Sequence, residues 1–412
     1  MMKRVFFILM ISLLFLPGAG SVPNATDPKV VHRKALTIDT HTDTPLAFIH
    51  FGLDMGVRND ARVTQTKVDF PRMKEGGLDA VFFAVYIGQG KRDSASVLLA
   101  RRQADLIFDE IYKTVHRNDT IAGLAYEARD AYRIEKEDKR AVFIGMENGY
   151  PLGTDLLLVE EYYDKGARYI TLCHSRNNDI CDSSTDPSGA EHEGLSAFGV
   201  QLVREMNRLG MIVDVSHISD NSFYDVLETS AAPVMASHSC ARALCNNPRN
   251  LDDDMLRALA RNGGVIQVCF VSSYLKEQEP DAERDSAMNA LMEKYRNFDE
   301  LDNEQRNKAM QEWMAMDEKY PEPLASVSDV VDHIDHIVRV AGIDHVGIGT
   351  DFDGGGAVNG CFDVSEMENI TVELVKRGYT STEIRKIWGG NLMRVFREVE
   401  NMARTIQRHS GE

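Results

Sequence analysis

The sequence ALTIDTHTD, residues 35–43, is the most informative stretch of this chain. It opens with a mostly apolar run and closes with a histidine and a carboxylate two residues apart, His41 and Asp43. In a strand, side chains at i and i+2 point to the same face, so this imidazole and carboxylate converge on one point. That convergence suits a metal ion such as zinc. The motif alone is common by chance, but later apolar runs in the chain end in the same way.

Apolar, β-branched runs alternate with segments of helical period along most of the chain. The expected strands are residues 35–43, 80–87, 141–147, 169–174, 211–217, 233–238, 264–270 and 346–351. Expected helices include residues 195–209, 251–261 and 327–340, each followed by a glycine that can end a helix. About eight alternations of strand and helix predict a TIM-like (β/α)8 barrel. A doubly wound open sheet is the alternative, but no Gly-x-Gly-x-x-Gly follows the first strand.

The first 20 residues have the layout of a cleaved secretory signal peptide. Lys3 and Arg4 precede an apolar run, and Gly18-Ala19-Gly20 offers small residues for cleavage. The run is too short for a transmembrane helix of about 20 residues, and neither a lipidation cysteine nor a GPI-type tail is present. We therefore expect an exported protein, periplasmic or secreted, with no membrane anchor. A lead of residues 21–33 would precede a single barrel domain, residues 34–412.

Composition excludes one class of partner. The chain is 43% hydrophobic and 27% charged, as in soluble globular proteins, and carries a formal net charge of −18. Nucleic acid needs a basic patch, so an acidic chain argues against nucleic-acid binding. Export would permit disulfides, but six cysteines leave the pairing open. Cys173 and Cys240 each adjoin a histidine, and we expect them to pack in the wall of a site.

Residues 276–323 interrupt the alternation of strand and helix. This segment is rich in Glu, Asp, Lys, Met and Arg and predicts one or two charged helices inserted between the last two strands. It is either a solvated excursion or a lid or dimer arm. We favour the solvated excursion, because charged helical faces are usually just solvated.

The ends of the expected strands carry an unusual concentration of histidines and carboxylates. In a (β/α)8 barrel the active site lies at the C-terminal ends of the strands. Those ends hold His41, Asp43, Glu147, His174, His217, His238 and Asp351. One strand-end histidine is usually structural, but seven such groups would cost stability unless they were paired. Two bound dications would compensate them, with Glu147 as the natural shared ligand.

The chain resembles the membrane dipeptidase (renal dipeptidase) family, peptidase family M19, within the amidohydrolase-like metal-dependent hydrolases. The resemblance runs from about Lys34 to Val399. It is carried by an ordered set of segments, Asp39-Thr40-His41-Thr42-Asp43, Gly145-Met146-Glu147-Asn148-Gly149, Tyr169-Ile170-Thr171-Leu172-Cys173-His174, Asp214-Val215-Ser216-His217, Ala236-Ser237-His238-Ser239 and Gly347-Ile348-Gly349-Thr350-Asp351-Phe352-Asp353-Gly354.

This resemblance implies a centre with two zinc ions per chain. His41 and Asp43 would bind one zinc ion, His217 and His238 would bind the other, and Glu147 would bridge them together with a hydroxide. Two dications lower the pKa of a shared water enough to supply hydroxide near neutral pH. Histidine and carboxylate ligands suit zinc, although manganese or cobalt also fits such a set.

The same resemblance assigns roles in catalysis and substrate binding. His174 would contact the substrate and steady the oxyanion, and Asp351 would act as the acid/base. Asp351 also fits a Gly-rich turn, and Asp353 is the less favoured acid. Arg249 would hold the free carboxylate of the substrate through its planar, bidentate guanidinium. Tyr274 would contact that carboxylate or pack in the core or at the rim.

The implied function is hydrolysis of free dipeptides, with tolerance for a D-residue at the C-terminal position. One alternative keeps the metal centre but acts on another amide or on a lactone, for example a β-lactam. A second alternative is a catalytically silent metal-binding protein, which the complete set of site residues disfavours. After His174 the chain reads Ser175-Arg176-Asn177-Asn178 and lacks the disulfide cysteine of the mammalian enzymes. The missing cysteine argues against a disulfide-linked dimer like that of the family, and a homodimer without that disulfide stays possible.

Overall fold

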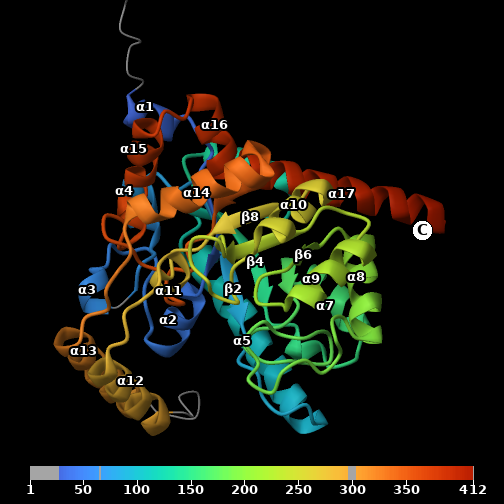
Figure 1. The fold of residues 1–412 in the computed structure, drawn as a ribbon, viewed down its shortest axis with the longest axis horizontal. Helices are drawn as coiled ribbons and strands as arrows, with labels where there is room; N and C mark the ends of the chain where they lie inside the picture. Colours follow the sequence, from blue (N-terminus) through green and yellow to red (C-terminus); the bar gives the residue numbers. More distant parts are fainter. Residues whose placement is uncertain (1–26, 65, 296–302, 412) are drawn as a thin grey trace, which may run out of the picture.

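A computed structural model of the chain describes residues 27–64, 66–295 and 303–411 (Figure 1). The expected signal peptide, residues 1–20, lies outside the described residues. The end of the expected lead forms a short helix, α1 (Pro28–Arg33), in which His32 is buried. His32 Nδ1 lies 2.7 Å from Thr371 Oγ1, and Nε2 lies 2.8 Å from the Gly76 carbonyl oxygen. This part of the lead is thus docked on the body of the protein.

Eight parallel strands, ordered around the sheet as they occur in the chain, form a nearly closed barrel surrounded by helices (Figure 1). They are β1 (Ile38–Thr42), β2 (Ala80–Tyr86), β4 (Arg140–Glu147), β5 (Ala167–Thr171), β6 (Ile212–Asp214), β7 (Met235–Ser239), β8 (Val265–Val268) and β9 (Val346–Ile348). A short strand that the sequence did not predict, β3 (Ala122–Leu124), pairs with β4 off this path. The predicted TIM-like (β/α)8 barrel is confirmed.

Strand β2 illustrates why continuous apolar runs mark these strands. Val81, Phe83 and Val85 pack outward in the layer between strands and helices. Ala80 and Phe82 face inward, in a second cluster. A parallel barrel strand is buried on both faces, so both alternating sets of side chains are apolar.

The helices lie between the strands and at both ends of the chain. The three predicted helices correspond to α8 (Ala197–Leu209), α10 (Asp253–Asn262) and α14 (Val327–Ala341). Two of them start two residues later than expected, because Ser196 and Asp252 accept hydrogen bonds as N-caps and are not themselves helical. The remaining helical elements are α2 (Thr44–His50), α3 (Ala61–Thr64), α4 (Phe70–Gly76), α5 (Ser94–Arg117), α6 (Ala128–Glu135), η1 (Tyr150–Leu152), α7 (Leu157–Asp164), α9 (Asp220–Thr229), α11 (Ser272–Leu275), α12 (Ala282–Lys294), α13 (Asn303–Lys319), η3 (Ile343–His345), η4 (Val364–Glu366), α15 (Glu368–Lys376), α16 (Ser381–Arg385), η5 (Lys386–Gly390) and α17 (Asn391–Ser410).

Aromatic side chains fill the barrel interior beneath the C-terminal strand ends. The ring of Phe82 stacks on Phe143 at a centroid distance of 4.7 Å and on Tyr169 at 5.5 Å. Phe396 of α17 meets Phe143 edge-on and belongs to the same cluster. A Cβ at Gly145 would lie 2.0 Å from the Tyr169 ring, so the motif around Glu147 needs glycine there. This packed floor supports the strand ends.

Hydrogen bonds rather than a regular ladder close the barrel between β1 and β9. The Asp351 amide donates to the His41 carbonyl oxygen (3.0 Å), and the Asp43 amide donates to the Phe352 carbonyl oxygen (2.9 Å). The buried Asp39 carboxylate accepts from the amide and hydroxyl of Thr350 at 2.9 and 2.6 Å. These bonds hold the two ends of the barrel sequence together.

Helices α12 and α13 lie in the expected segment 276–323, between β8 and β9. In Figure 1 they stand out from the barrel at the lower left. Within the described residues, no helix combines the length and apolar character that crossing a membrane requires.

Candidate metal centre

The predicted site residues converge at the C-terminal end of the barrel, although several lie just beyond their strands. His41, Glu147 and His238 lie within β1, β4 and β7. His174 and His217 each follow the last residue of a strand by three positions, as Asp351 does after β9. The sequence placed them at strand ends because apolar residues continue into these loops.

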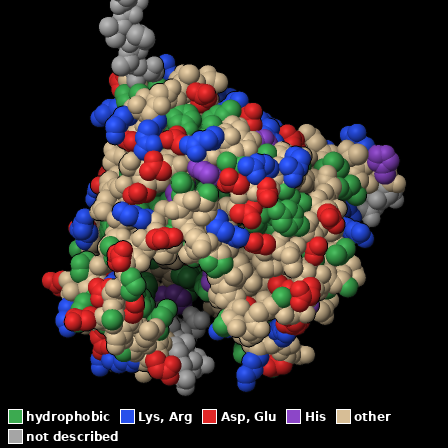
Figure 2. All heavy atoms as spheres, in the orientation of Figure 1, with side chains coloured by type: hydrophobic (Ala, Val, Ile, Leu, Met, Phe, Trp, Pro, Cys, Tyr) green, Lys and Arg blue, Asp and Glu red, His purple; other side chains and the backbone are tan. Residues whose placement is uncertain are grey.

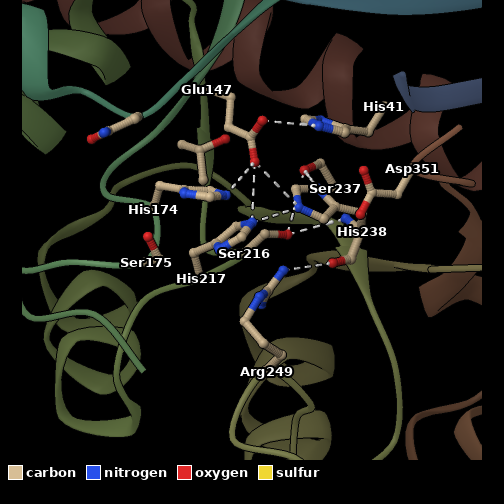
Figure 3. Close-up of polar contacts among 12 residues, drawn as sticks. His41, Glu147, His174, Ser175, Ser216, His217, Ser237, His238, Arg249 and Asp351 are labelled. Atoms are coloured by element: carbon tan, nitrogen blue, oxygen red, sulfur yellow. Dashed lines mark hydrogen bonds and ion pairs between the residues drawn. The ribbon is translucent and has the colours of Figure 1, made fainter. Parts of the chain in front are cut away.

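Glu147 lies at the centre of four imidazoles (Figure 3). Its Oε1 lies 3.1 Å from Nε2 of His217, 3.6 Å from Nε2 of His238 and 3.7 Å from Nε2 of His174. Its Oε2 lies 3.3 Å from Nε2 of His41. The two carboxylate oxygens thus face two different sets of nitrogen atoms. Such a carboxylate is placed to bridge two cations.

Two further carboxylates complete the cluster on the side of His41. Asp43 Oδ2 lies 3.8 Å from His41 Nε2, and His41, Asp43 and Asp351 offer donor atoms within 4.8 Å of one another. The same holds for His41, Glu147 and His238, and for Glu147, His174 and His217. The predicted ligands His41, Asp43, Glu147, His217 and His238 therefore form one continuous cluster.

The less favoured acid of the two, Asp353, is occupied by other partners. Its Oδ2 accepts from the Thr44 hydroxyl and its Oδ1 from the Lys67 amide, both at 2.6 Å. Asp351, by contrast, has the Cys269 thiol as a distant donor to Oδ2, at 3.8 Å. Of these two aspartates, Asp351 is therefore the one whose carboxylate is free to exchange a proton.

Groups behind the histidines fix their rings. The Tyr169 hydroxyl lies 2.8 Å from His41 Nδ1, and the Ser237 hydroxyl lies 2.8 Å from His238 Nδ1. Ser237 in turn donates to the buried Asp214 carboxylate at 2.6 Å. Hydrogen bonds of this kind set ring orientation and tautomer in metal sites. The sequence motifs contain Tyr169, Asp214 and Ser237 but do not predict these contacts, because they depend on side chains from different strands.

Burial and charge set the protonation of the cluster. Burial lowers the pKa of His217 and of His238 well below the usual value, so both imidazoles are neutral, as metal binding requires. Burial alone would raise the pKa of Glu147, but the imidazoles of His41 and His217 hold it well below its usual range. Burial raises the pKa of Asp43, and the negative charge of Glu147 raises it further. Burial would lower the pKa of His41, but the charge of Glu147 outweighs it and raises that pKa to about 10. The carboxylates therefore favour positive charge beside His41, either a proton or a cation.

Backbone strain also concentrates here. The described residues include six non-glycine residues with positive φ, and four of them follow C-terminal strand ends: Asn148 (φ 76°), His217 (70°), Asp351 (61°) and Asp353 (68°). The left-handed region is unfavourable for residues with a Cβ and persists where surrounding structure enforces it. The strain aims His217 and Asp351 at the cluster.

The side chains present fit a pair of divalent cations. His41 Nε2, Asp43 Oδ1, His174 Nδ1 and His217 Nδ1 are buried without a hydrogen-bond partner among the described residues. The Nε2 atoms of His217 and His238 lie 2.8 Å apart. Unpartnered buried polar atoms are costly, and a bound cation would satisfy His41 Nε2 and the Asp43 carboxylate. His174 and His217 face Glu147 through Nε2, so their Nδ1 atoms point away from the cluster. Imidazoles with carboxylates are ligands that zinc accepts.

Arg249 approaches the cluster from the loop after β7 (Figure 3). It is 4% exposed, and its Nη2 donates to the His238 carbonyl oxygen at 3.1 Å. Its Nε is buried without a partner among the described residues. The guanidinium lies 5.3 Å from the ring centroid of Tyr274, which also packs on the core. The structure thus brings Arg249 and Tyr274 together beside the centre.

A parallel barrel with histidines and carboxylates gathered at its C-terminal end defines the class of metal-dependent hydrolases. Comparison with known proteins narrows this class. Residues 26–410 match the model of the membrane dipeptidase family (peptidase family M19), and the chain belongs to that family.

Individual relatives agree with this membership. The chain is 33% identical over 399 residues to dipeptidase tcpJ of Claviceps purpurea, covering 94% of this chain and 83% of the fungal protein. It is 32% identical to mouse dipeptidase 3 over 89% of this chain, a match that spans 64% of the mouse protein. The probable dipeptidase PvdM of Pseudomonas aeruginosa superposes with a TM-score of 0.78 at 31% identity, covering 91% of this chain and 98% of PvdM. The chain is therefore a metal-dependent dipeptidase of this family.

None of the six cysteines, all of which lie in the described part of the chain, forms a disulfide. Each is buried. The Cys173 thiol faces the His217 carbonyl oxygen at 3.9 Å, and the Cys240 thiol faces the Cys269 carbonyl oxygen at 3.4 Å. These contacts agree with packing in the wall of the site, as expected from their positions beside histidines.

Proposed function

We propose that this chain hydrolyses the peptide bond of free dipeptides at a centre of two zinc ions. The observation that carries the proposal is the position of Glu147, whose two carboxylate oxygens face separate groups of histidines. His41 and Asp43 would hold one ion, and His217 and His238 the other, with Glu147 shared between them. When bound, two such cations supply hydroxide near neutral pH by lowering the pKa of water.

Arg249 would bind the free C-terminal carboxylate of the dipeptide. Its guanidinium carries five N–H donors, and one is used by the His238 carbonyl oxygen. The unpartnered Nε and the remaining donors suit a bidentate carboxylate. A buried cation at a fixed distance from the scissile bond would explain a preference for dipeptides over longer chains.

His174 and Asp351 would carry the proton chemistry. The neutral His174 imidazole has one N–H to donate, and its Nδ1 is unpartnered, so it can steady the carbonyl oxygen as negative charge develops. Burial raises the pKa of Asp351 to about 6. A carboxylate with such a pKa can take a proton from water and return it to the departing amine.

A panel of four substrates tests the proposal. The mature chain is loaded with zinc and assayed by mass spectrometry on L-Ala–L-Ala, L-Ala–D-Ala, a carboxyl-amidated dipeptide and a β-lactam, each with and without chelator. We expect chelator-sensitive cleavage of both free dipeptides and poor cleavage of the amide. Cleavage of the β-lactam alone would move the protein to another hydrolase substrate, and no cleavage despite bound metal would reduce it to a binding protein.

L-Ala–D-Ala is included in the panel because of a ligand bound to a protein of the same fold. A Rhodobacter sphaeroides metallopeptidase with the same fold (TM-score 0.71, 22% identity, covering 89% of this chain and 99% of that protein) was crystallised with a phosphinate mimic of L-Ala-D-Ala. We extend that tolerance to this chain as part of the proposal. We also propose export through residues 1–20, for which Edman sequencing of the mature protein is the direct test.

A further inference from the structure

A large cavity adjoins the metal centre and is built mainly by the helices inserted between β8 and β9. Its volume is about 700 Å3, within the range of about 300–1,000 Å3 usual for small-molecule sites. In Figure 2 the surface is hollowed between the part formed by these helices, at the lower left, and the body of the protein. The lining of the cavity reaches the cluster around Glu147 at Gly354 and Gly355.

That wall is the segment Gly354-Gly355, directly after the strained residues Asp351 and Asp353. Both glycines line the cavity. On its other side, Gly354 is so close to the centre that a Cβ there would lie 2.1 Å from Asp43 Oδ2 and 2.2 Å from Asp351 Oδ1. Gly354 therefore lies beside both the cavity and two carboxylates of the centre, with no side chain of its own between them.

The inserted helices give the cavity an apolar lining. Met288, Leu291 and Met292 of α12 line it at the spacing of one helical face. No described residue of α12 is buried, and Met292 is 57% exposed, so this apolar face is not packed into a core. From α13, Ala309 and Trp313, four residues apart, also line the cavity. An apolar face left open toward a cavity is suited to an apolar ligand.

The remaining wall of the cavity carries charged groups of both signs. Lys67 and Arg284 supply positive charge, and three carboxylates, those of Asp317, Glu322 and Asp353, supply negative charge. Arg284 is also engaged by the Tyr320 carbonyl oxygen at 3.2 Å. The carboxylates outnumber the cations by one, so the cavity does not favour an anionic group, and its apolar lining is left to select the ligand.

We propose that this cavity is a specificity subsite for a large apolar side chain of the substrate, aromatic or thioether. The inference rests on the proposed dipeptide hydrolysis and deepens it. A dipeptide bound between Arg249 and the centre would extend one side chain past Gly354-Gly355 onto Trp313. The charged insertion then acts as part of the binding site, in contrast to the solvated excursion favoured from sequence.

The test compares dipeptides that differ only in side-chain size. Values of kcat/KM are measured for L-Ala–L-Ala, L-Phe–L-Ala and L-Ala–L-Phe with wild type, Trp313→Ala and the matched control Met314→Ala, a half-buried residue of α13 that does not line the cavity. We expect Trp313→Ala to lose about tenfold or more on a phenylalanine substrate and to keep L-Ala–L-Ala within about twofold, since apolar pocket contacts are worth about 10- to 200-fold. Equal losses on all substrates, or none, would overturn the proposal.

A second variant tests the same subsite in case Trp313→Ala does not fold. Met292→Glu places a carboxylate at the exposed rim of the cavity. Leu157→Glu likewise replaces an exposed apolar side chain with a carboxylate, at an 80% exposed site on α7 outside the cavity lining. Only Met292→Glu should weaken the preference for phenylalanine. Unchanged selectivity in Met292→Glu would count against the subsite.

Fluorescence separates this inference from the proposed hydrolysis. The sequence has two tryptophans, Trp313 and Trp388, and Trp388 is buried with its N–H bonded to Thr371 Oγ1. In zinc-loaded protein carrying Trp388→Phe and Asp351→Asn, emission reports Trp313. L-Phe-containing dipeptides should change that emission at concentrations where L-Ala–L-Ala does not. If wild type cleaves nothing, the hydrolysis proposal fails, whereas an unresponsive Trp313 overturns the subsite.

Discussion

Replacing Arg249 with methionine removes the guanidinium while keeping most of the aliphatic stem. Arg249 is 4% exposed, and its Nη2 donates a hydrogen bond to the His238 carbonyl oxygen. Its other N–H groups remain available to a substrate carboxylate. A hydrogen bond to a charged partner contributes about 1.5–3 kcal/mol, so losing a bidentate pair should cost about 3 kcal/mol. That free energy corresponds to a decrease of about 100- to 200-fold in kcat/KM for a free dipeptide.

The assay is a double-mutant cycle between protein and substrate. Wild type and Arg249→Met are each assayed on L-Ala–L-Ala and on its carboxyl-amidated form, with zinc content measured in parallel. The amide lacks the charge that Arg249 would bind, so it should lose less than about tenfold in the variant. Equal losses on acid and amide would refute the carboxylate clamp and reduce Arg249 to a structural support of the His238 loop.

Four further predictions concern the centre. Glu147→Gln should lower bound metal, measured by plasma mass spectrometry, and abolish activity, since the shared ligand loses its charge; two metals with full activity would contradict the assignment. Asp351→Asn should keep both metals but lower kcat by about 10²–10⁴-fold, and metal loss would instead make Asp351 a ligand. Asp351 must be ionised to act as the base, and nearby cations favour its ionised form. The plot of kcat/KM against pH should therefore rise with an apparent pKa at or below about 6. An apparent pKa clearly above 6 would exclude Asp351 as the base. Tyr169→Phe should weaken metal affinity by about 10- to 100-fold by freeing His41 Nδ1, and unchanged affinity would show that this hydrogen bond does not orient His41.

The sequence by itself determined the barrel and the rim at which the candidate site residues gather. Strands buried on both faces require continuous apolar runs, and those runs alternate with segments of helical period, so fold class and strand order follow from local pattern. Parallel strands in chain order place every C-terminal strand end at one rim, which is why the sequence alone could group His41, Glu147, His217 and His238.

Only the tertiary structure decided how these residues relate in space. The contacts of Tyr169 with His41 and of Asp214 through Ser237 to His238 join strands far apart in sequence, and no local pattern encodes them. The sequence already favoured Asp351 over Asp353 as the acid, but the physical reason, the contacts of Thr44 and Lys67 with both oxygens of Asp353, appears only in the structure.

In the inserted segment 276–323, the sequence predicts the helices, and only tertiary packing decides what they face. Its composition predicted charged helices, and α12 and α13 lie there. Its sequence shows Met288, Leu291, Met292 and Trp313 without showing what they face. Local sequence sets the period of a helix, but the direction in which that helix presents its apolar face is fixed by packing against distant parts of the chain. Here the packing sets that face over a cavity beside Gly354-Gly355.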